Sequence, residues 1–221
     1  MADVGRGSAP DGSPLAVYRA LPPGNAPDLI HAAIPGGAEI LELGSGPGRL
    51  TTRLIELGHP VTAVDNDPEM VAAVALTGAT PVLGDILDLD LGRWFPVVVL
   101  ASHFIDTPPP DGDAFVAAAA RHVAPDGIVL IEAYPPALDW TAAVGRRSQV
   151  GPVGVTVTRA RISDERLEAA VAYELDGQVW EQPFAARRLD EPAIRSILDG
   201  AGLAFERWLD EREGWFSARP R

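Results

Sequence analysis

The stretch Glu42-Leu43-Gly44-Ser45-Gly46-Pro47-Gly48 places three glycines at alternate positions, directly after the apolar run 38–43. That run predicts a buried strand, and the apolar spacing that follows predicts a helix over 48–57, closed by Gly58. Glycines are needed where a turn takes conformations that a Cβ would block and where a ligand approaches the bare backbone. We therefore expect a ligand-binding turn at the carboxyl end of the first strand.

Strand-like and helix-like segments alternate on the carboxyl side of this turn. Two short helices are expected before it, over 15–21 and 26–34. An alternation of buried strands and helices predicts a parallel α/β sheet with right-handed crossovers. The strands expected after the first are 61–65, 80–83, 96–102 and 127–133, and the helices between them are 68–76 and 113–123.

The pattern changes in the last third of the chain, where apolar and polar residues alternate. Three such segments, separated by turn signals at 163–165 and at Asp176-Gly177, predict a three-stranded antiparallel meander. We place this meander as an insertion, at about 150–188, within one domain over 15–221. The segments are 154–162, 166–175 and 178–187, followed by a helix over 191–200 and a closing hairpin over 203–209 and 215–218.

The first fourteen residues are rich in Gly, Pro, Ser and Asp and show no apolar periodicity. Such a stretch buries too little apolar surface to offset the entropy of ordering it, so we expect a disordered tail over 1–14. This stretch also lacks the apolar segment of a signal peptide, and the longest strongly apolar run is too short to cross a bilayer. We expect a cytoplasmic protein.

The net charge and the composition exclude several kinds of binding partner, catalytic group and metal site. The net charge is −13, which opposes binding to nucleic acid or to an anionic membrane. The chain has no Cys, which excludes disulfides, thiolate nucleophiles and thiolate zinc sites. It has no Lys, which excludes a Schiff-base lysine and a Walker-type phosphate loop. The four His residues have no carboxylate neighbours at metal-ligand spacing, so no metal is expected.

Three motifs together resemble the class I S-adenosylmethionine-dependent methyltransferases. They are the spacing Glu42-x-Gly44-x-Gly46-x-Gly48, an acidic residue at the end of the second strand (Asp65), and Gly84-Asp85-Ile86 after the third strand. A dinucleotide-binding turn would instead need a small residue at the sixth position from the first glycine, where this chain has Arg49. The resemblance implies a Rossmann-like seven-stranded α/β sheet with one reversed strand, and S-adenosylmethionine as cofactor.

The resemblance also implies which positions would contact this cofactor. The glycines would line its methionine and ribose side, Asp65 would accept from the two ribose hydroxyls, and Asp85 would accept from the adenine amino group. Asn66 and Met70 would flank the adenine. The complete set implied is Tyr18, Glu42, Gly44, Gly46, Gly48, Asp65, Asn66, Met70, Asp85, Ile86, Leu100 and Ala101.

The residues themselves leave alternatives open at several of these positions. Asp85 can cap the turn that follows it, since Asp is a common turn former. Met70 on a helix is more often a plain core residue than a ligand contact. Glu42 can anchor the loop, and Tyr18 can be either part of a lid or a core residue.

The acceptor side is expected where the fourth and fifth strands end. An activated methyl donor needs positioning and exclusion of water more than it needs a base, so a general base is optional. We take His103 as the candidate base, Asp106 as the residue that orients it and Tyr134 as the reserve base. His103 can instead be a loop histidine satisfied by backbone, and Asp106 can simply shape the turn before the proline run.

These observations predict a small-molecule methyltransferase that acts on oxygen or nitrogen. An antiparallel insertion at this place resembles that of sugar and glycine N-methyltransferases, which favours a role in bacterial secondary metabolism. The alternative is a protein that holds S-adenosylmethionine in a noncatalytic or non-methylating role. We also expect a homodimer through residues 150–190, because the meander leaves a sheet edge or face that a small domain cannot easily cover.

Overall fold

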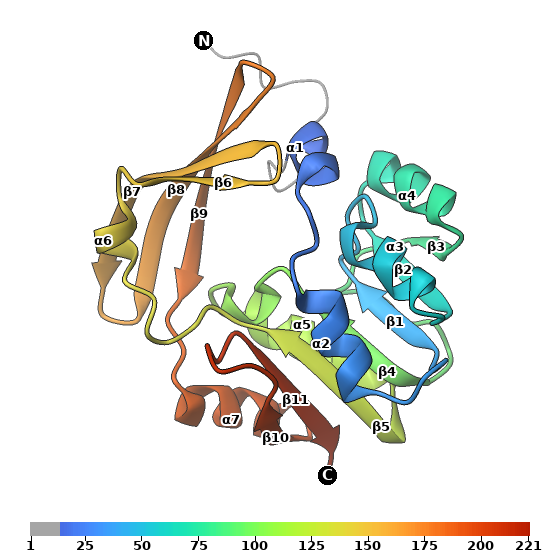
Figure 1. Cartoon of the computed structure of the whole chain (residues 1–221). Helices are drawn as coiled ribbons and strands as arrows, with labels where there is room; N and C mark the ends of the chain where they lie inside the picture. Colours follow the sequence, from blue (N-terminus) through green and yellow to red (C-terminus); the bar gives the residue numbers. More distant parts are fainter. Residues whose placement is uncertain (1–13) are drawn as a thin grey trace.

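The computed structural model describes residues 14–221. The disordered tail expected over 1–14 therefore lies, except for Pro14, outside the described residues. Seven strands form the larger sheet, in the order β10-β11-β5-β4-β1-β2-β3, and four form a second, antiparallel sheet (Figure 1). The larger sheet is parallel except for β11, which pairs antiparallel with both β5 and β10. The expected seven-stranded sheet with one reversed strand is confirmed.

The elements of the first half follow the sequence pattern closely, with ends that differ by a residue or two, except that β5 begins four residues before the expected strand 127–133. The apolar runs form the central strands because both of their faces are buried, as in other parallel sheets. In chain order, the elements are α1 (Leu15–Ala20), α2 (Ala26–Ala33), β1 (Ile40–Leu43), α3 (Arg49–Glu56), β2 (Val61–Asp65), α4 (Pro68–Val74), the 3-10 turn η1 (Ala75–Thr77), β3 (Thr80–Leu83), β4 (Phe95–Leu100), the 3-10 turn η2 (Phe104–Asp106), α5 (Asp111–His122) and β5 (Val123–Glu132).

The second half carries the inserted sheet and then returns to the larger sheet. Its elements are α6 (Trp140–Ala143), β6 (Arg147–Val150), β7 (Val153–Ser163), β8 (Arg166–Leu175), β9 (Gln178–Arg187), α7 (Glu191–Gly200), β10 (Leu203–Trp208) and β11 (Trp215–Pro220). Asp176 and Gly177 both have positive φ, as a two-residue hairpin turn between β8 and β9 requires.

Three expectations need correction. The inserted sheet has four strands, not three, because β6 pairs with β7; all four β6 residues are exposed, so β6 has no alternation of apolar and polar residues to reveal it. The short helix α6 was missed, although Asp139 caps it by accepting from Thr141 and Ala142 N–H. Residues 124–126, which the expected helix 113–123 and strand 127–133 leave as a turn between them, lie within β5, as an irregularity in its pairing with β4.

Alternate residues of the central strands face two separate apolar layers. Leu41 and Leu43 of β1 pack in the layer that contains α5 and α7, whereas Ile40 packs in the layer that contains α2 and α3. A third, smaller apolar cluster lies against one face of the inserted sheet and contains Trp140 and Leu167. The larger sheet is therefore covered on both faces, and its free space lies beyond the carboxyl ends of the strands, where ligands bind in open α/β sheets.

Candidate functional site

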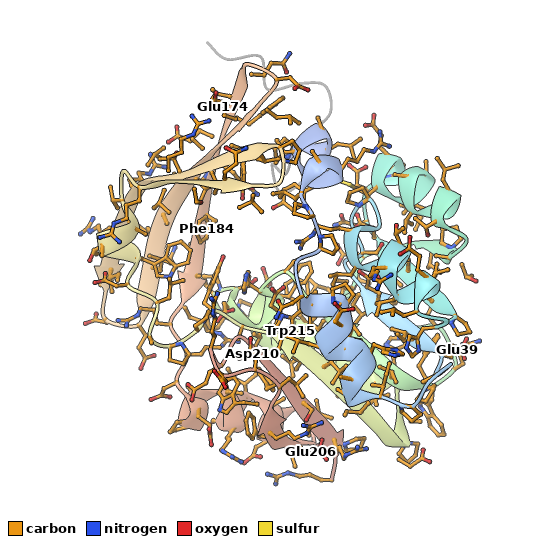
Figure 2. The ribbon with its side chains drawn as sticks, in the orientation of Figure 1. Glu39, Glu174, Phe184, Glu206, Asp210 and Trp215 are labelled. Atoms are coloured by element: carbon orange, nitrogen blue, oxygen red, sulfur yellow. The ribbon has the colours of Figure 1, made fainter. Side chains whose placement is uncertain are left out.

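A cavity of about 790 Å³ lies at the carboxyl ends of the central strands, within the usual range for small-molecule sites. One wall is the loop after β1, with the ends of β2 and β4. The opposite wall is the inner face of the inserted sheet, which contributes side chains from β7, β8 and β9. Phe184 of β9 lies on the side of the inserted sheet that faces the rest of the molecule (Figure 2). The inserted sheet is thus a wall of the cavity and not a remote lobe.

The three glycines after β1 have the backbone conformation that the sequence predicted for this turn. Gly44, Gly46 and Gly48 all have positive φ, which side chains other than glycine rarely adopt. Gly44 and Gly46 line the cavity. Gly48 does not: it begins α3, and a Cβ there would lie 3.0 Å from Val74 and Thr77 side-chain atoms. Its role is the close packing of α3 against the α4–η1 segment.

The two aspartates at strand ends both line the cavity, and both also hold backbone N–H groups. Asp65 Oδ2 accepts from Gly46 N at 2.7 Å, and its Oδ1 accepts from Asp67 N at 3.0 Å. Asp85 Oδ1 accepts from Leu87 N at 2.9 Å, so the turn-capping alternative for Asp85 is present in the structure. A carboxylate has about four lone-pair sites, so a carboxylate that accepts from backbone N–H groups can accept from a ligand at the same time.

The remaining candidates for cofactor contact divide into two groups. Asn66, Met70, Ile86 and Ala101 line the cavity, although Met70 is only 3% exposed. Leu100 is fully buried in the core and does not line the cavity. The cavity wall is thus formed by Ala101, the next residue along the chain.

Glu42 is almost completely buried, and Thr51 Oγ1 donates to its Oε2 at 2.6 Å. Burial raises the pKa of Glu42 to about 7, although the Thr51 hydrogen bond lowers it. This contact joins β1 to α3 across the glycine loop. The loop-anchor alternative is therefore present in the structure, while Glu42 also reaches the cavity wall.

The turn after β4 has an uncommon backbone. Ser102 and His103 both have positive φ, at 56° and 59°, which is costly for residues other than glycine and is often found at functional sites. Ser102 N donates to Glu132 Oε2 at 2.7 Å. Glu132, at the end of β5, thus fixes this turn, and it also lines the cavity.

The His103 ring lies against Tyr134, with ring centroids 3.8 Å apart and an interplanar angle of 16°. Its Nδ1 lies 3.8 Å from Asp106 Oδ2, and its Nε2 lies 3.9 Å from Glu132 Oε1; both distances are too long for hydrogen bonds. Burial lowers the pKa of His103. The imidazole is therefore neutral near pH 7, and its Nδ1 has no hydrogen-bond partner among the described residues.

Asp106 does not orient the His103 ring through a hydrogen bond. It is 1% exposed, and its Oδ2 accepts from Tyr134 N at 2.9 Å. Burial raises the pKa of Asp106 to about 8. Asp106 is thus largely protonated near neutrality, and in this structure it fixes the backbone that carries Tyr134.

Burial also raises the pKa of Tyr134, so its hydroxyl stays protonated at neutral pH. This argues against Tyr134 as the reserve base. Its ring instead contacts Trp140, with centroids 5.0 Å apart, and Phe184, with centroids 6.3 Å apart. Trp140 and Phe184 are 5.6 Å apart. We call these three rings the aromatic corner; all three line the cavity beside His103.

Tyr18 of α1 closes the cavity from the amino-terminal side. Its hydroxyl donates to Gln182 Oε1 at 3.5 Å, and its ring centroid lies 6.4 Å from that of Tyr173. Tyr18 thus connects α1 to the inserted sheet. The contributions of Gln182 and Tyr173 were not expected, because the alternation in β8 and β9 shows two faces but not which face turns toward the larger sheet.

Within residues 14–221, no three His, Asp or Glu side chains are grouped as a metal site requires. The same residues contain no helix long and apolar enough to cross a membrane.

Comparison with known proteins gives a consistent result. Residues 40–127 match the family model described as a methyltransferase domain. An uncharacterised methyltransferase of Mycobacterium tuberculosis is 40% identical over 83 residues, which is 36% of this chain and 34% of that protein. A trans-aconitate 2-methyltransferase of the same species is 36% identical over 89 residues, which is 39% of this chain and 28% of that protein. The chain thus spans about a third of the length of these curated relatives.

Two solved structures are similar over almost the whole chain. The CcbJ methyltransferase from Streptomyces caelestis has a TM-score of 0.72 and 20% identity, covering 90% of this chain and 96% of its own. The sugar N-methyltransferase KedS8 from Streptoalloteichus has a TM-score of 0.70 and 22% identity, covering 100% of this chain and 96% of its own. At these identities the likeness establishes the fold.

Proposed function

We propose that this chain, which has the fold of the class I S-adenosylmethionine-dependent methyltransferases and a methyltransferase domain over residues 40–127, methylates an oxygen or nitrogen of a small molecule. The observation that carries the proposal is the single cavity of about 790 Å³. This cavity joins the glycine loop and Asp65 to His103 and the aromatic corner. A donor and an acceptor can therefore meet in the same cavity.

The residues on the β1–β2 side fit the cofactor. When bound, S-adenosylmethionine supplies a methyl group on a positively charged sulfur, so that transfer is an in-line displacement. No atom of residues 14–221 lies within 4 Å of the position of a Cβ at Gly46, so these residues leave the bare backbone there open to a ligand. Asp65 has acceptor sites for the hydroxyls of a ribose, and Asn66 and Met70 line the adjoining wall.

The residues on the β4–β5 side would act on the acceptor. His103 would accept a proton from the attacking atom, since its imidazole is neutral near pH 7. Glu132 holds the turn that carries His103, and the aromatic corner would exclude water from the reacting atoms. Positioning would supply most of the rate enhancement, because the donor is already activated.

We further propose that the acceptor is neither nucleic acid nor membrane lipid, because the net charge of −13 opposes association with a polyanion. We propose a cytoplasmic location and a role in bacterial secondary metabolism as well. The second is supported by a structural neighbour from Micromonospora echinaspora, an amino pentose methyltransferase involved in calicheamicin biosynthesis. A homodimer through the inserted sheet is supported by the edge strands β6 and β9 and by the exposed side chains of Val150 and Val179.

The test is transfer of labelled methyl from S-adenosylmethionine to a panel of small amines and hydroxy compounds. Transfer to at least one acceptor, abolished by S-adenosylhomocysteine in excess, is the expected result. Calorimetric binding of S-adenosylhomocysteine with no transfer to any acceptor would instead favour the noncatalytic alternative. No binding of either cofactor form would contradict both functions.

A further inference from the structure

The acceptor half of the cavity has a distinct electrostatic character. Seven aromatic side chains line the cavity, including the aromatic corner, and the inserted sheet contributes no charged side chain to it. Tyr173 and Gln182 supply the polar groups of that wall, among Val, Ala, Pro and Phe residues. An acceptor that fits this wall has a flat, apolar body, because aromatic and aliphatic surfaces bind such groups by burial.

The charged groups of the cavity are mostly acidic. On the acceptor side, Glu132 and Asp106 line the wall near His103, but Asp106 is largely protonated because burial raises its pKa to about 8, so Glu132 is the acidic group that carries the argument there. Among the described residues, no Arg lines the wall near His103. Arg49 is the one Arg among the lining residues, and it lies at the glycine loop, where its Nη1 donates to Pro22 O at 3.3 Å. Arg187 lies outside this cavity, and its Nη1 pairs with Asp113 Oδ1 at 2.7 Å. Among the described residues, a carboxylate or phosphate bound beside Glu132 would therefore have no Arg in the adjoining wall as a hydrogen-bond partner.

A cation would find two kinds of partner at the same place. Glu132 Oε2 accepts a hydrogen bond from Ser102 N, whereas Glu132 Oε1 lies 3.9 Å from His103 Nε2, which is too far for a hydrogen bond. Oε1 can therefore accept from a ligand. The rings of the aromatic corner also line the cavity, and aromatic rings attract a positive charge, as aromatic cages do for ammonium ligands. One face of Tyr134 is covered by the His103 ring, which leaves Trp140 and Phe184 as the rings for this contact. The net charge of −13 acts in the same direction, since it attracts cations and slows the approach of anions.

We infer that the acceptor is an amine on a flat apolar body, bound as an ammonium ion between Glu132 and the aromatic corner. This inference rests on the proposed methyl transfer for its chemistry but not for its binding. In the reaction, the ammonium first loses a proton to the His103 imidazole. The nitrogen lone pair then forms the N–C bond while the S–C bond breaks and its electron pair stays on sulfur. The product is a methylated ammonium ion, because the nitrogen takes on the positive charge that the sulfur loses, and the proton on His103 passes to water.

Three probes with one indole body test the inference by calorimetry. They are tryptamine, which is a cation at neutral pH, 3-ethylindole, which is neutral, and indole-3-propionate, which is an anion. Each is titrated into the protein with and without saturating S-adenosylhomocysteine. Tryptamine should bind at least about tenfold more tightly than indole-3-propionate, which is the size expected for a hydrogen-bonded charge pair shielded from water. Equal or tighter binding of indole-3-propionate would overturn the inference.

Variants assign the charge preference to Glu132. Glu132→Gln should lower the affinity for tryptamine about tenfold and leave that for 3-ethylindole nearly unchanged, because only the ammonium uses the carboxylate charge. Phe184→Ala should weaken all three probes, because it removes part of the apolar wall. The matched control is Glu168→Gln, which removes an exposed carboxylate that pairs with Arg166 outside the cavity. An equal loss for all three probes in Glu132→Gln would show a structural effect and count against the inference.

The titrations with and without S-adenosylhomocysteine distinguish a failure of this inference from a failure of the proposed function. If S-adenosylhomocysteine does not bind, the methyltransferase proposal fails, while the ranking of the three probes without it still decides the charge preference. If S-adenosylhomocysteine binds and the anion is preferred, the methyltransferase proposal stands and the amine assignment fails.

Discussion

His103 combines a strained backbone, a stacked ring and an imidazole nitrogen without a partner among residues 14–221. If it is the base, His103→Ala should lower the rate of methyl transfer about 10²-fold or more and leave the affinity for S-adenosylhomocysteine nearly unchanged. Since burial lowers the pKa of His103, wild-type single-turnover rates should fall only as the pH drops below about 6.5, the ordinary value for a histidine. A flat wild-type profile, with a variant rate within a few-fold, would remove His103 from the mechanism.

Asp65 has two roles that a pair of substitutions can separate. Asp65→Ala should weaken binding of S-adenosylhomocysteine by about 1–3 kcal/mol, the cost of leaving polar groups unpaired. It also removes the acceptor of Gly46 N–H, so part of this loss can come from the loop. Asp65→Asn retains an oxygen for Gly46 and should show a smaller loss. Calorimetry on folded Asp65→Ala that shows unchanged affinity would refute the assignment of Asp65 to the cofactor.

The buried carboxyl of Asp106 links stability to pH. Its pKa rises from 3.8 to about 8 on folding, so the folded state holds a proton that the unfolded state releases in this range. The free energy of unfolding that this proton contributes is fully present below the unfolded-state pKa of 3.8, and it is lost as the pH rises from there toward 8. Asp106→Asn can still accept from Tyr134 N and does not titrate. Urea unfolding between pH 5 and pH 8.5 should show a weaker decline in the variant; parallel declines would contradict this account.

At the scale of elements, the contact between η2 and α5 depends on the absence of one Cβ. A Cβ at Gly112 would lie 2.3 Å from Thr107 O and 2.9 Å from Ile105 O, which are backbone atoms that cannot rotate away. Gly112→Ala should therefore destabilise the fold by about 1–3 kcal/mol, as overpacking does. Because η2 carries Asp106 and follows His103, the variant should also slow methyl transfer.

Gly200→Ala is the matched control for this substitution. Gly200 also lies in a helix, at the end of α7, and nothing lies within 4 Å of the position of its Cβ. That change should stabilise the protein by up to about 1 kcal/mol, since alanine favours helix more than glycine does. Urea unfolding of both variants measures the difference. Similar stability changes in the two would show that the η2–α5 contact does not depend on Gly112.

At the scale of the whole molecule, the inserted sheet presents one face to the cavity, and β6 and β9 are its two edge strands (Figure 1). Pairing of two copies about a two-fold axis would cover such an edge. We expect light scattering at high concentration to give the mass of two chains. Val179→Glu, which places a charge on the edge strand β9, should shift this mass toward one chain. A mass of one chain for the unmodified protein would contradict the homodimer.

Local patterns in the sequence were sufficient to predict the larger sheet and many of the residues that line the cavity at the glycine loop and the end of β2. The alternation of apolar runs and helices, the glycines after β1 and Asp65 at the end of β2 are short-range signals, because each reports the burial or backbone conformation of its own segment. The same holds for the Asp176-Gly177 turn, which joins adjacent strands. These features depend on few distant contacts, so they can be read from residues close together in the chain.

Only the tertiary structure shows which residues form the part of the cavity near His103, where we place the acceptor. Which face of β8 and β9 turns inward depends on packing against the rest of the molecule, and so does the approach of Glu132 to the Ser102 turn. Desolvation also acts only after folding: it makes Asp106 a buried acid that holds Tyr134, where the sequence suggested a partner for His103. Strand β6 could not be predicted from the sequence either. Its exposed residues pair with β7 through the backbone, and backbone pairing leaves no pattern in the side chains.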